Sequence, residues 1–234
     1  MPEPLYVADR ITGNLMVASR VLLVAGGLVL LTGGAPVAAQ TSWSLTAGVG
    51  QPAWSGPYVV GGKFAVSLLA VSLQRPMGGG WTGRAEVGAQ DDVGDLGITG
   101  LFELPTSVAF YRAHLAAIAR RRAGSGPFFM EAGAALWLQT GCDVDTSGGP
   151  GYFGGQTVGC DDWRDDASTE SSNPTLRPKS TGFNLLVGAG VQGRRFGALV
   201  RFEPIGTAVI QTDAGAIRAR SLTLALQWTP IVRP

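Results

Sequence analysis

After residue 40, apolar residues alternate with small or polar residues along most of the chain. The clearest case is the segment 221–228, in which Leu222, Leu224, Leu226 and Trp228 fall on one face. A period of two indicates a β-strand, because successive side chains of a strand point to opposite faces. The same pattern predicts seven more strands, and one of these (63–74) is apolar on both faces, so its phase stays open. The other predicted strands are 43–50, 63–74, 81–90, 111–120, 128–139, 183–192 and 196–203.

The second face of these strands is unusual for a surface that meets water. It combines Gly, Ala, Ser, Thr and Gln with only a few charged residues, whereas a soluble sandwich presents polar residues to solvent. The connections also alternate in length. The short ones are 75–80, 121–127 and 193–195, and the long polar ones are 51–62, 91–107, 140–181 and 204–220. Short turns at one end, long loops at the other and an even strand number are typical of an outer-membrane barrel. The predicted fold class is therefore all-β, an eight-stranded antiparallel up-and-down transmembrane β-barrel.

The N-terminal segment indicates export. Arg20 precedes an apolar run over 21–31, and a small-residue end follows at 37–39. A basic region, a short apolar core and an A-x-A-like end form a signal peptide, which we expect to be cleaved before Gln40. The alternative is an uncleaved anchor, although a membrane span needs about 20 apolar residues. We assign 1–39 to the signal peptide, with Met16 as an alternative start.

The remaining chain, 40–234, resembles the small eight-stranded outer-membrane barrels of the OmpA and OmpX type. The resemblance depends on the signal peptide, the alternating strands, the loop asymmetry and the last strand, SLTLALQW, with its aromatic end. It implies a monomer in the bacterial outer membrane, in contact with outer-membrane lipid. In that family the assembly machinery reads a C-terminal aromatic strand. Here six residues follow Trp228, so the chain departs from the family pattern at this point.

A literal G-x-G-x-x-G occurs at Gly188, Gly190 and Gly193. As a dinucleotide fingerprint it would have to end a strand and open a helix. The residues that follow, 194–204, show strand alternation and no helical spacing. Gly188 and Gly190 are instead predicted to point inward, where missing side chains leave room in a narrow lumen, and Gly193 is assigned to a tight turn. We therefore predict no cofactor.

Charged side chains on the inward phase predict an ion-pair network inside the barrel. Buried charges persist only when they are paired, because desolvation costs several kcal/mol per ion. We expect this network to close the lumen, and the alternative is a narrow ion path along the same residues. The predicted members are Arg84, Glu86, Arg112, His114, Glu131, Arg201 and Glu203.

Cys142 and Cys160 are the two cysteines of an exported chain, and this predicts a disulfide. They fall in the long connection at 140–181, which is acidic. Its start, Asp143-x-Asp145-x-Ser147-Gly148, resembles a calcium loop, but the twelfth position is a glycine and no flanking helices are predicted. We therefore predict no metal site and expect a disulfide-pinned surface loop.

Long loops carry recognition in many folds, so a surface partner would contact this loop through aromatics such as Tyr152, Phe153 and Trp163. A different set of aromatic side chains falls on the outward phase near strand ends. Rings at that depth form the interfacial girdles of membrane barrels. These residues are Trp43, Trp81, Tyr111, Phe128, Phe183, Phe196 and Trp228.

These patterns favour a non-catalytic barrel with a structural or surface-recognition role. The net charge of +1, with no basic cluster among aromatics, gives no indication of nucleic-acid binding. One alternative is a secreted or periplasmic soluble barrel that binds a small apolar ligand. A second is a narrow channel or a lipid-modifying enzyme based on His114, for which the chain lacks an H-x-S pattern and a lipid-facing phase.

Overall fold

The computed structural model describes residues 41–62, 65–97, 105–146, 157–160, 176–204 and 207–230. The predicted signal peptide lies outside these residues. No helix in the described ranges is long and apolar enough to cross a lipid bilayer. The described chain forms the strands β1 (Ser42–Ser55), β2 (Val59–Gly62), β3 (Ala65–Gly78), β4 (Trp81–Gly97), β5 (Pro105–Arg122), β6 (Phe128–Thr146), β7 (Thr157–Gly159), β8 (Arg177–Pro178), β9 (Thr181–Gln192), β10 (Phe196–Phe202), β11 (Ala208–Thr212) and β12 (Gly215–Trp228).

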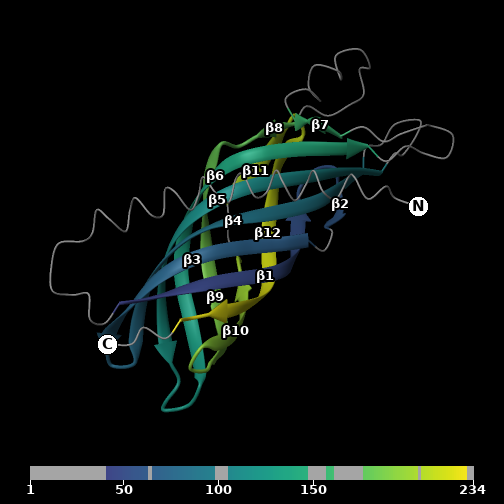
Figure 1. The fold of residues 1–234 in the computed structure, drawn as a ribbon. Helices are drawn as coiled ribbons and strands as arrows, with labels where there is room; N and C mark the ends of the chain where they lie inside the picture. The colour runs from purple at the N-terminus through teal and green to yellow at the C-terminus, as the bar shows by residue number, and fades with distance from the viewer. Residues whose placement is uncertain are drawn as a thin grey trace, which may run out of the picture.

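Eight of these strands form a closed antiparallel ring. The order is β1-β3-β4-β5-β6-β9-β10-β12, and β12 pairs again with β1 to close the sheet (Figure 1). Each ring strand neighbours the next ring strand in the chain, so the barrel has up-and-down topology. The short strands extend one end of it, where β2 pairs with β4, β7 with β6, and β8 with β11. The predicted eight-stranded antiparallel barrel is confirmed.

The ring shows its apolar residues outward, as the alternation predicts. On β12, Leu224 and Leu226 are 58% and 68% exposed, whereas Thr223 and Gln227 are buried at 3% and 1%. The same pattern settles the phase of the ambiguous segment 63–74. On β3 the side chains of Ala70 and Ser72 are buried inside the barrel, and the intervening strand positions face outward.

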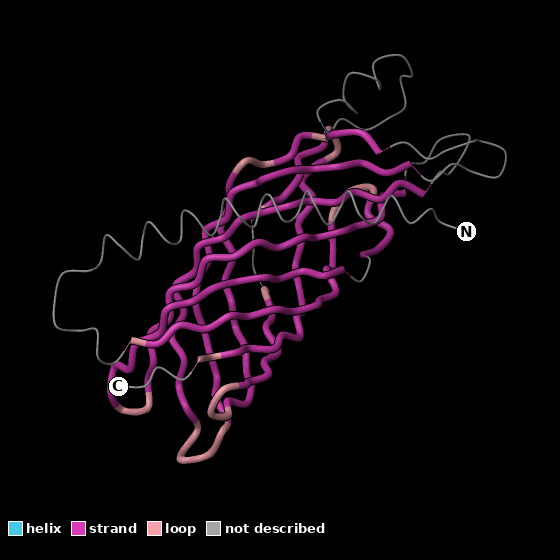
Figure 2. Tube along the Cα trace, in the orientation of Figure 1, coloured by secondary structure: helices cyan, strands magenta, loops and turns pink. Residues whose placement is uncertain are grey.

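The strands extend much further than the alternation predicted. β1 continues to Ser55, β4 to Gly97, and β6 to Thr146, so the predicted connections 51–62, 91–107 and 140–181 begin or end inside strands. The last long connection, 204–220, likewise contains β11 and the first part of β12. Figure 2 shows these long strands meeting in tight turns at one end of the barrel. The predicted strand limits were wrong because the polarity of the two faces exchanges partway along the strands.

β12 shows this exchange within a single strand. Its outward residues begin with Arg218 and Arg220, both exposed, and continue with leucines from Leu222 onward. Its inward residues begin with Ile217, which is fully buried, and become hydroxyl-bearing at Ser221. A prediction that follows apolar residues on only one face therefore ends the strand where these residues move to the other face.

The loop end of the ring thus has an apolar interior of its own. Trp137 and Phe110 pack edge to face there, with ring centroids 5.6 Å apart. At this level Asp91 and Asp95 occupy outward positions of β4, whereas Leu96 lies on the inward face of the same strand and is buried. The buried cluster consists of Trp54, Leu96, Val108, Phe110, Trp137, Cys142, Val144, Cys160, Leu176, Val209, Ile210, Ile217 and Ala219.

The G-x-G-x-x-G sequence joins two strands, because β9 ends at Gln192 and β10 begins at Phe196. Gly190 lies beneath the ring of Phe129: a Cβ on this glycine would lie 2.7 Å from Phe129 Cζ and would also clash with the Ala198 carbonyl oxygen. Gly193 donates its N–H to the Phe196 carbonyl oxygen at 2.8 Å, within the turn. The glycines therefore serve the close packing of the barrel.

The Gly190→Leu variant tests this packing. We expect a loss of about 1–3 kcal/mol in the free energy of unfolding, because the added side chain overfills the space occupied by Phe129. The measurement is urea unfolding in detergent micelles, followed by tryptophan fluorescence. Gly126→Ala is the matched control, since a Cβ at Gly126 has its nearest neighbour at 3.8 Å, and its unfolding midpoint should stay unchanged. Equal midpoints for both variants would contradict the role given to Gly190.

Candidate functional site

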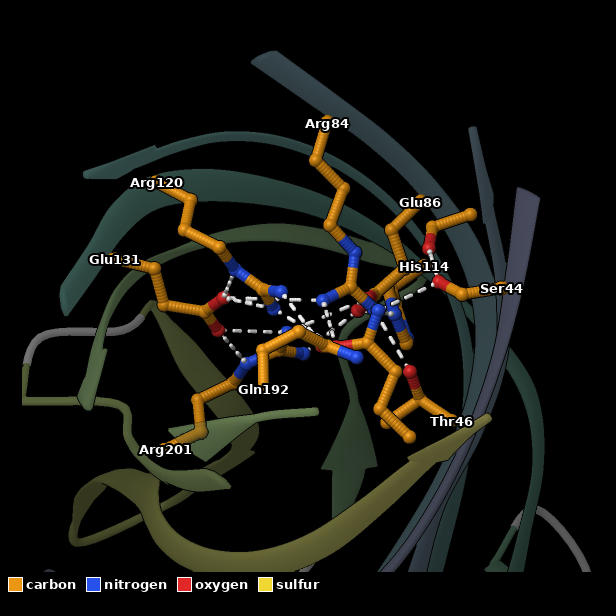
Figure 3. A network of polar contacts seen from close by, with 11 residues as sticks. Ser44, Thr46, Arg84, Glu86, His114, Arg120, Glu131, Gln192 and Arg201 are labelled. Carbon is orange, nitrogen blue, oxygen red and sulfur yellow. Dashed lines mark hydrogen bonds and ion pairs between the residues drawn. The ribbon is translucent and has the colours of Figure 1, made fainter. Parts of the chain in front are cut away.

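The inward charged side chains meet in the middle of the barrel and form two clusters. The turn-side cluster consists of Arg84, Glu86, His114, Arg120, Glu131 and Arg201, and most of its contacts are drawn in Figure 3. The loop-side cluster consists of Asp92, Arg112 and Glu203, with the amides of Gln90 and Asn184. The structure brings together all seven predicted lumen residues, and each is at most 8% exposed.

Glu86 and Glu131 are the centres of the turn-side cluster. Glu86 Oε1 lies 2.6 Å from Arg201 Nη1 and 3.3 Å from His114 Nε2, and its other oxygen pairs with Arg84. Glu131 Oε1 accepts from Arg201 Nη2 at 3.0 Å, and Glu131 Oε2 accepts from Arg120 Nη2 at 2.9 Å. Arg201 therefore bridges two carboxylates that come from β4 and β6.

Polar side chains attach this cluster to the rest of the ring. Arg84 Nη2 donates to Thr46 Oγ1 at 2.8 Å, and Arg120 Nη2 donates to Gln227 Oε1 at 2.9 Å. Gln227 Nε2 in turn donates to Ser44 Oγ at 2.8 Å, and Ser44 shares a hydrogen bond with Ser72 at 2.7 Å. These contacts connect the charges to β1, β3 and β12, so the network crosses the lumen.

The loop-side cluster is centred on Arg112. Its Nε lies 2.8 Å from Asp92 Oδ2, and its Nη2 lies 3.0 Å from Glu203 Oε2. The amide of Gln90 fits this site with its oxygen 2.8 Å from Arg112 Nη2 and its nitrogen 3.2 Å from Glu203 Oε1. Asn184 donates to Glu203 and accepts from Trp137 Nε1 at 3.3 Å. The cluster thus joins the charged zone to the apolar interior above it.

The sequence prediction missed two members of the network, Asp92 and Arg120. Arg120 lies on the inward phase of the predicted strand 111–120, so its phase alone could have identified it. Asp92 continues the inward phase of Arg84 and Glu86 beyond the predicted strand end at residue 90. With these two residues the clusters contain four arginines and four carboxylates, so their formal charges cancel when His114 is neutral. Such pairing is what buried ions require.

A small cavity lies between the two clusters. Its volume is about 10 Å³, and its lining includes Arg112, His114, Trp137, Asn184 and Glu203. A space of this size is close to the minimum for one water molecule. His114 Nε2 faces Glu86, and His114 Nδ1 makes no hydrogen bond with any described residue. The imidazole is enclosed in the lumen, away from the outer surface where a lipid-modifying enzyme would bind its substrate.

The predicted disulfide between Cys142 and Cys160 is present, with the Cα atoms 5.4 Å apart. Its surroundings differ from the prediction, because Cys142 belongs to β6 and both sulfurs lie in the apolar cluster of the loop end. The disulfide therefore links Cys160, the residue after β7, covalently to β6 in the barrel wall. Most of the predicted acidic loop lies outside the described residues, including Ser147, Gly148, Tyr152, Phe153 and Trp163. Within the described ranges, no group of three or more His, Cys, Asp or Glu residues could hold a metal ion.

The predicted outward aromatics lie on the outer surface of the ring. Six of the seven are exposed, and Tyr111 is half-buried. Trp43 and Trp228 form an edge-to-face pair with centroids 5.4 Å apart, and Trp228 is opposite Phe196 in the register of β12 and β10. Together with Trp81 and Phe128, these rings surround the turn end of the barrel.

Comparison with known proteins gives structural likeness only. No family model matches the chain, and no curated protein matches it in sequence. Among solved structures, surface protein A (NspA) of Neisseria is 11% identical, with a TM-score of 0.45, over 80% of this chain and 97% of that chain. The attachment invasion locus protein Ail of Yersinia pestis is 10% identical, with a TM-score of 0.40, over 82% of this chain and 99% of that chain. The fold assignment is based on the strand pairing described above.

Glu86→Gln tests the balance of the lumen charges. The substitution keeps the shape of the side chain but leaves Arg201 and Arg84 without the charge they share, so we expect about 3–5 kcal/mol less stability. The measurement is again the urea unfolding midpoint. Asp213→Asn, in an exposed turn, is the matched control and should change stability by less than about 0.5 kcal/mol. An unchanged unfolding midpoint in Glu86→Gln would show that the network does not hold the barrel together.

Proposed function

We propose that this protein is a non-catalytic barrel of the bacterial outer membrane that presents its loop end at the cell surface for a structural or recognition role. The observation that carries the proposal is the exchange of polarity along single strands. On β12 the outward side chains change from Arg218 and Arg220 to Leu222 and Leu224 within a few residues. Such a change is expected where a protein surface passes from water into hydrocarbon.

The outward apolar residues of the ring strands form a belt around the barrel, which we call the apolar belt. On β6, outward positions are apolar from Phe128 to Leu138, which spans eleven residues, and both end residues are about 60% exposed at 61% and 59%. A tilted strand needs about 9–11 residues to cross a membrane. Closure of the ring supports the same proposal, because hydrocarbon offers no hydrogen-bond partners to an open sheet edge. In water, a contiguous exposed apolar belt of this size would favour aggregation.

The interior supports a closed lumen. The two charged clusters cross the lumen from wall to wall, and the cavity between them is about 10 Å³. A pocket for a small-molecule ligand is typically larger than about 300 Å³, so this interior argues against a soluble barrel that binds an apolar ligand. The enclosed position of His114 argues equally against lipid-modifying chemistry. The apolar cluster of the loop end adds a second layer above the charges.

The loop end is the candidate for recognition. Here β2, β7, β8 and β11 extend the barrel beyond the apolar belt, and the disulfide joins Cys160 to β6. A firm extension of this kind would hold surface loops away from the membrane, and loops on a rigid scaffold are where binding residues tend to occur. Export by a signal peptide and insertion by the outer-membrane assembly machinery belong to the same proposal.

Nitroxide labels test the membrane belt. We expect Leu224→Cys and Val200→Cys labels in lipid vesicles to be accessible to oxygen and shielded from a water-soluble nickel complex. A label at Ser55→Cys, on an outward position of β1 beyond the belt, should show the opposite behaviour. The native cysteines are joined in a disulfide and should not react. Recovery of a soluble protein with water-accessible labels at Leu224 and Val200 would contradict the proposal and favour the soluble barrel.

Planar-bilayer recordings test whether the lumen is closed. The wild-type protein should show no stable conductance on the nanosiemens scale, because paired charges fill the cross-section. The double variant Arg120→Ala, Glu131→Ala removes the Arg120–Glu131 ion pair and one of the two carboxylates that Arg201 bridges. It leaves the net charge unchanged, and it should open brief, small conductances. A heat-dependent mobility shift on a gel shows that each sample is folded. Stable large channels formed by the wild type would identify it as a porin instead.

A further inference from the structure

In the described residues, the three turns at one end of the barrel carry exposed arginines and no acidic side chain. The three turns at 75–80, 121–127 and 193–195 contain no Asp or Glu. At this end the exposed arginines are Arg75, Arg121, Arg122, Arg194 and Arg195. The loop end differs, because its outward positions include both aspartates and arginines, as on β4 and β12. The exposed charged side chains of the three turns are therefore all positive.

Two of these arginines lie on β3 and β5, the strands on either side of β4, which carries Trp81 at its turn end. Arg75 is opposite Gly83 in the register of β3 and β4, and Trp81 is opposite Arg121 in the register of β4 and β5. The Arg121 guanidinium carbon lies 5.4 Å from the centre of the Trp81 ring. All three side chains occupy outward positions of adjacent strands, and each is exposed. We call Arg75, Trp81 and Arg121 the turn-end patch.

The patch directly continues the apolar belt. On β3 the outward residue before Arg75 is Leu73, and on β5 the outward residue next to Arg121 is Ala119. A molecule that lies along this wall would meet apolar side chains first and two cations at its end. Tryptophan rings favour this same depth, because one part of the indole is apolar and its N–H is polar.

The geometry of Arg121 leaves it able to bind an anion. A cation–π contact with an aromatic ring needs no hydrogen-bond acceptor, and the N–H donors of a guanidinium lie in its own plane. Those donors match two oxygens of a phosphate in a bidentate arrangement. Within the three turns, which the structure describes in full, no carboxylate is available to neutralise these donors.

We propose that the turn-end patch is a headgroup site for an anionic phospholipid, with the phosphate between Arg75 and Arg121 and the acyl chains along Leu73 and Ala119. The inference depends on the proposed membrane insertion. A lipid is favoured over an acidic polymer because only a lipid would fill both the apolar wall and the cationic end. Arg122, Arg194 and Arg195 would add a general attraction for the same leaflet.

The test is native mass spectrometry of the full barrel in detergent micelles, titrated with phosphatidylglycerol or phosphatidylcholine. The wild type should bind phosphatidylglycerol more tightly than phosphatidylcholine. In the double variant Arg75→Gln, Arg121→Gln, the Kd for phosphatidylglycerol should rise by about tenfold or more, since each surface arginine contributes about fivefold to the attraction. The Kd for phosphatidylcholine should rise less, because its choline cation offsets the attraction of the same phosphate for the two arginines.

The matched control is Arg177→Gln, Lys179→Gln, which removes two exposed positive charges from the opposite end of the barrel and should leave both Kd values unchanged. Equal binding of the two lipids by the wild type, or an unchanged Kd in the patch variant, would overturn the inference while the membrane belt stands. So would binding to purified peptidoglycan that the patch variant alone loses. Water-accessible labels at Leu224 would remove the inference together with the proposed function, and a gel mobility shift identifies any variant that fails to fold.

Discussion

The pairing of buried charges is the interaction on which the rest of this barrel depends. A ring of eight strands leaves a lumen that side chains fill, so each ion on the inward phase must be satisfied by groups from other strands. Arg201 meets this requirement by bridging Glu86 and Glu131, which come from β4 and β6. Because a single unpaired ion costs several kcal/mol, the clusters favour one register and one closure of the ring. The network therefore acts as a set of cross-links between strands that are distant in the sequence.

Two surroundings, water at the loop end and the hydrocarbon we propose along the apolar belt, explain why the apolar residues change face along the strands. Along the belt, leucines such as Leu224 face outward because the surroundings we propose are apolar, and the interior carries the ions. Beyond Arg220 the outer wall faces water, and the interior becomes apolar around residues such as Phe110 and Ile217. The loop end is therefore stabilised like a small soluble domain, by apolar burial and a disulfide. The turn half depends instead on ion pairs inside and, in the membrane we propose, on lipid outside.

Much of this could be predicted from the sequence, because alternation is a local property. It gave the eight ring strands and the inward phase of residues such as Arg84 and Glu131. The strand ends could not be predicted in the same way, since the apolar residues move to the other face near Asp92 and Ser221. Nor could the partners be predicted: Glu86 and Arg201 are 115 residues apart, and only closure and register bring them together. The pairing of Cys142 with Cys160 was accessible because the chain has no other cysteine.

The distribution of charge along the barrel follows from the same electrostatic cost. Inside the belt, arginines occur beside carboxylates, as Arg112 does beside Asp92 and Glu203. Outside the belt, where water or headgroups can solvate an ion, arginines no longer need a carboxylate from the chain. The turn end shows this clearly, with Arg121 beside Trp81 and Arg75 on the neighbouring strand β3. A basic, acid-free surface at the edge of an apolar wall is matched to a phosphate-bearing lipid, so the membrane itself would supply the counter-charge that the lumen obtains from glutamate.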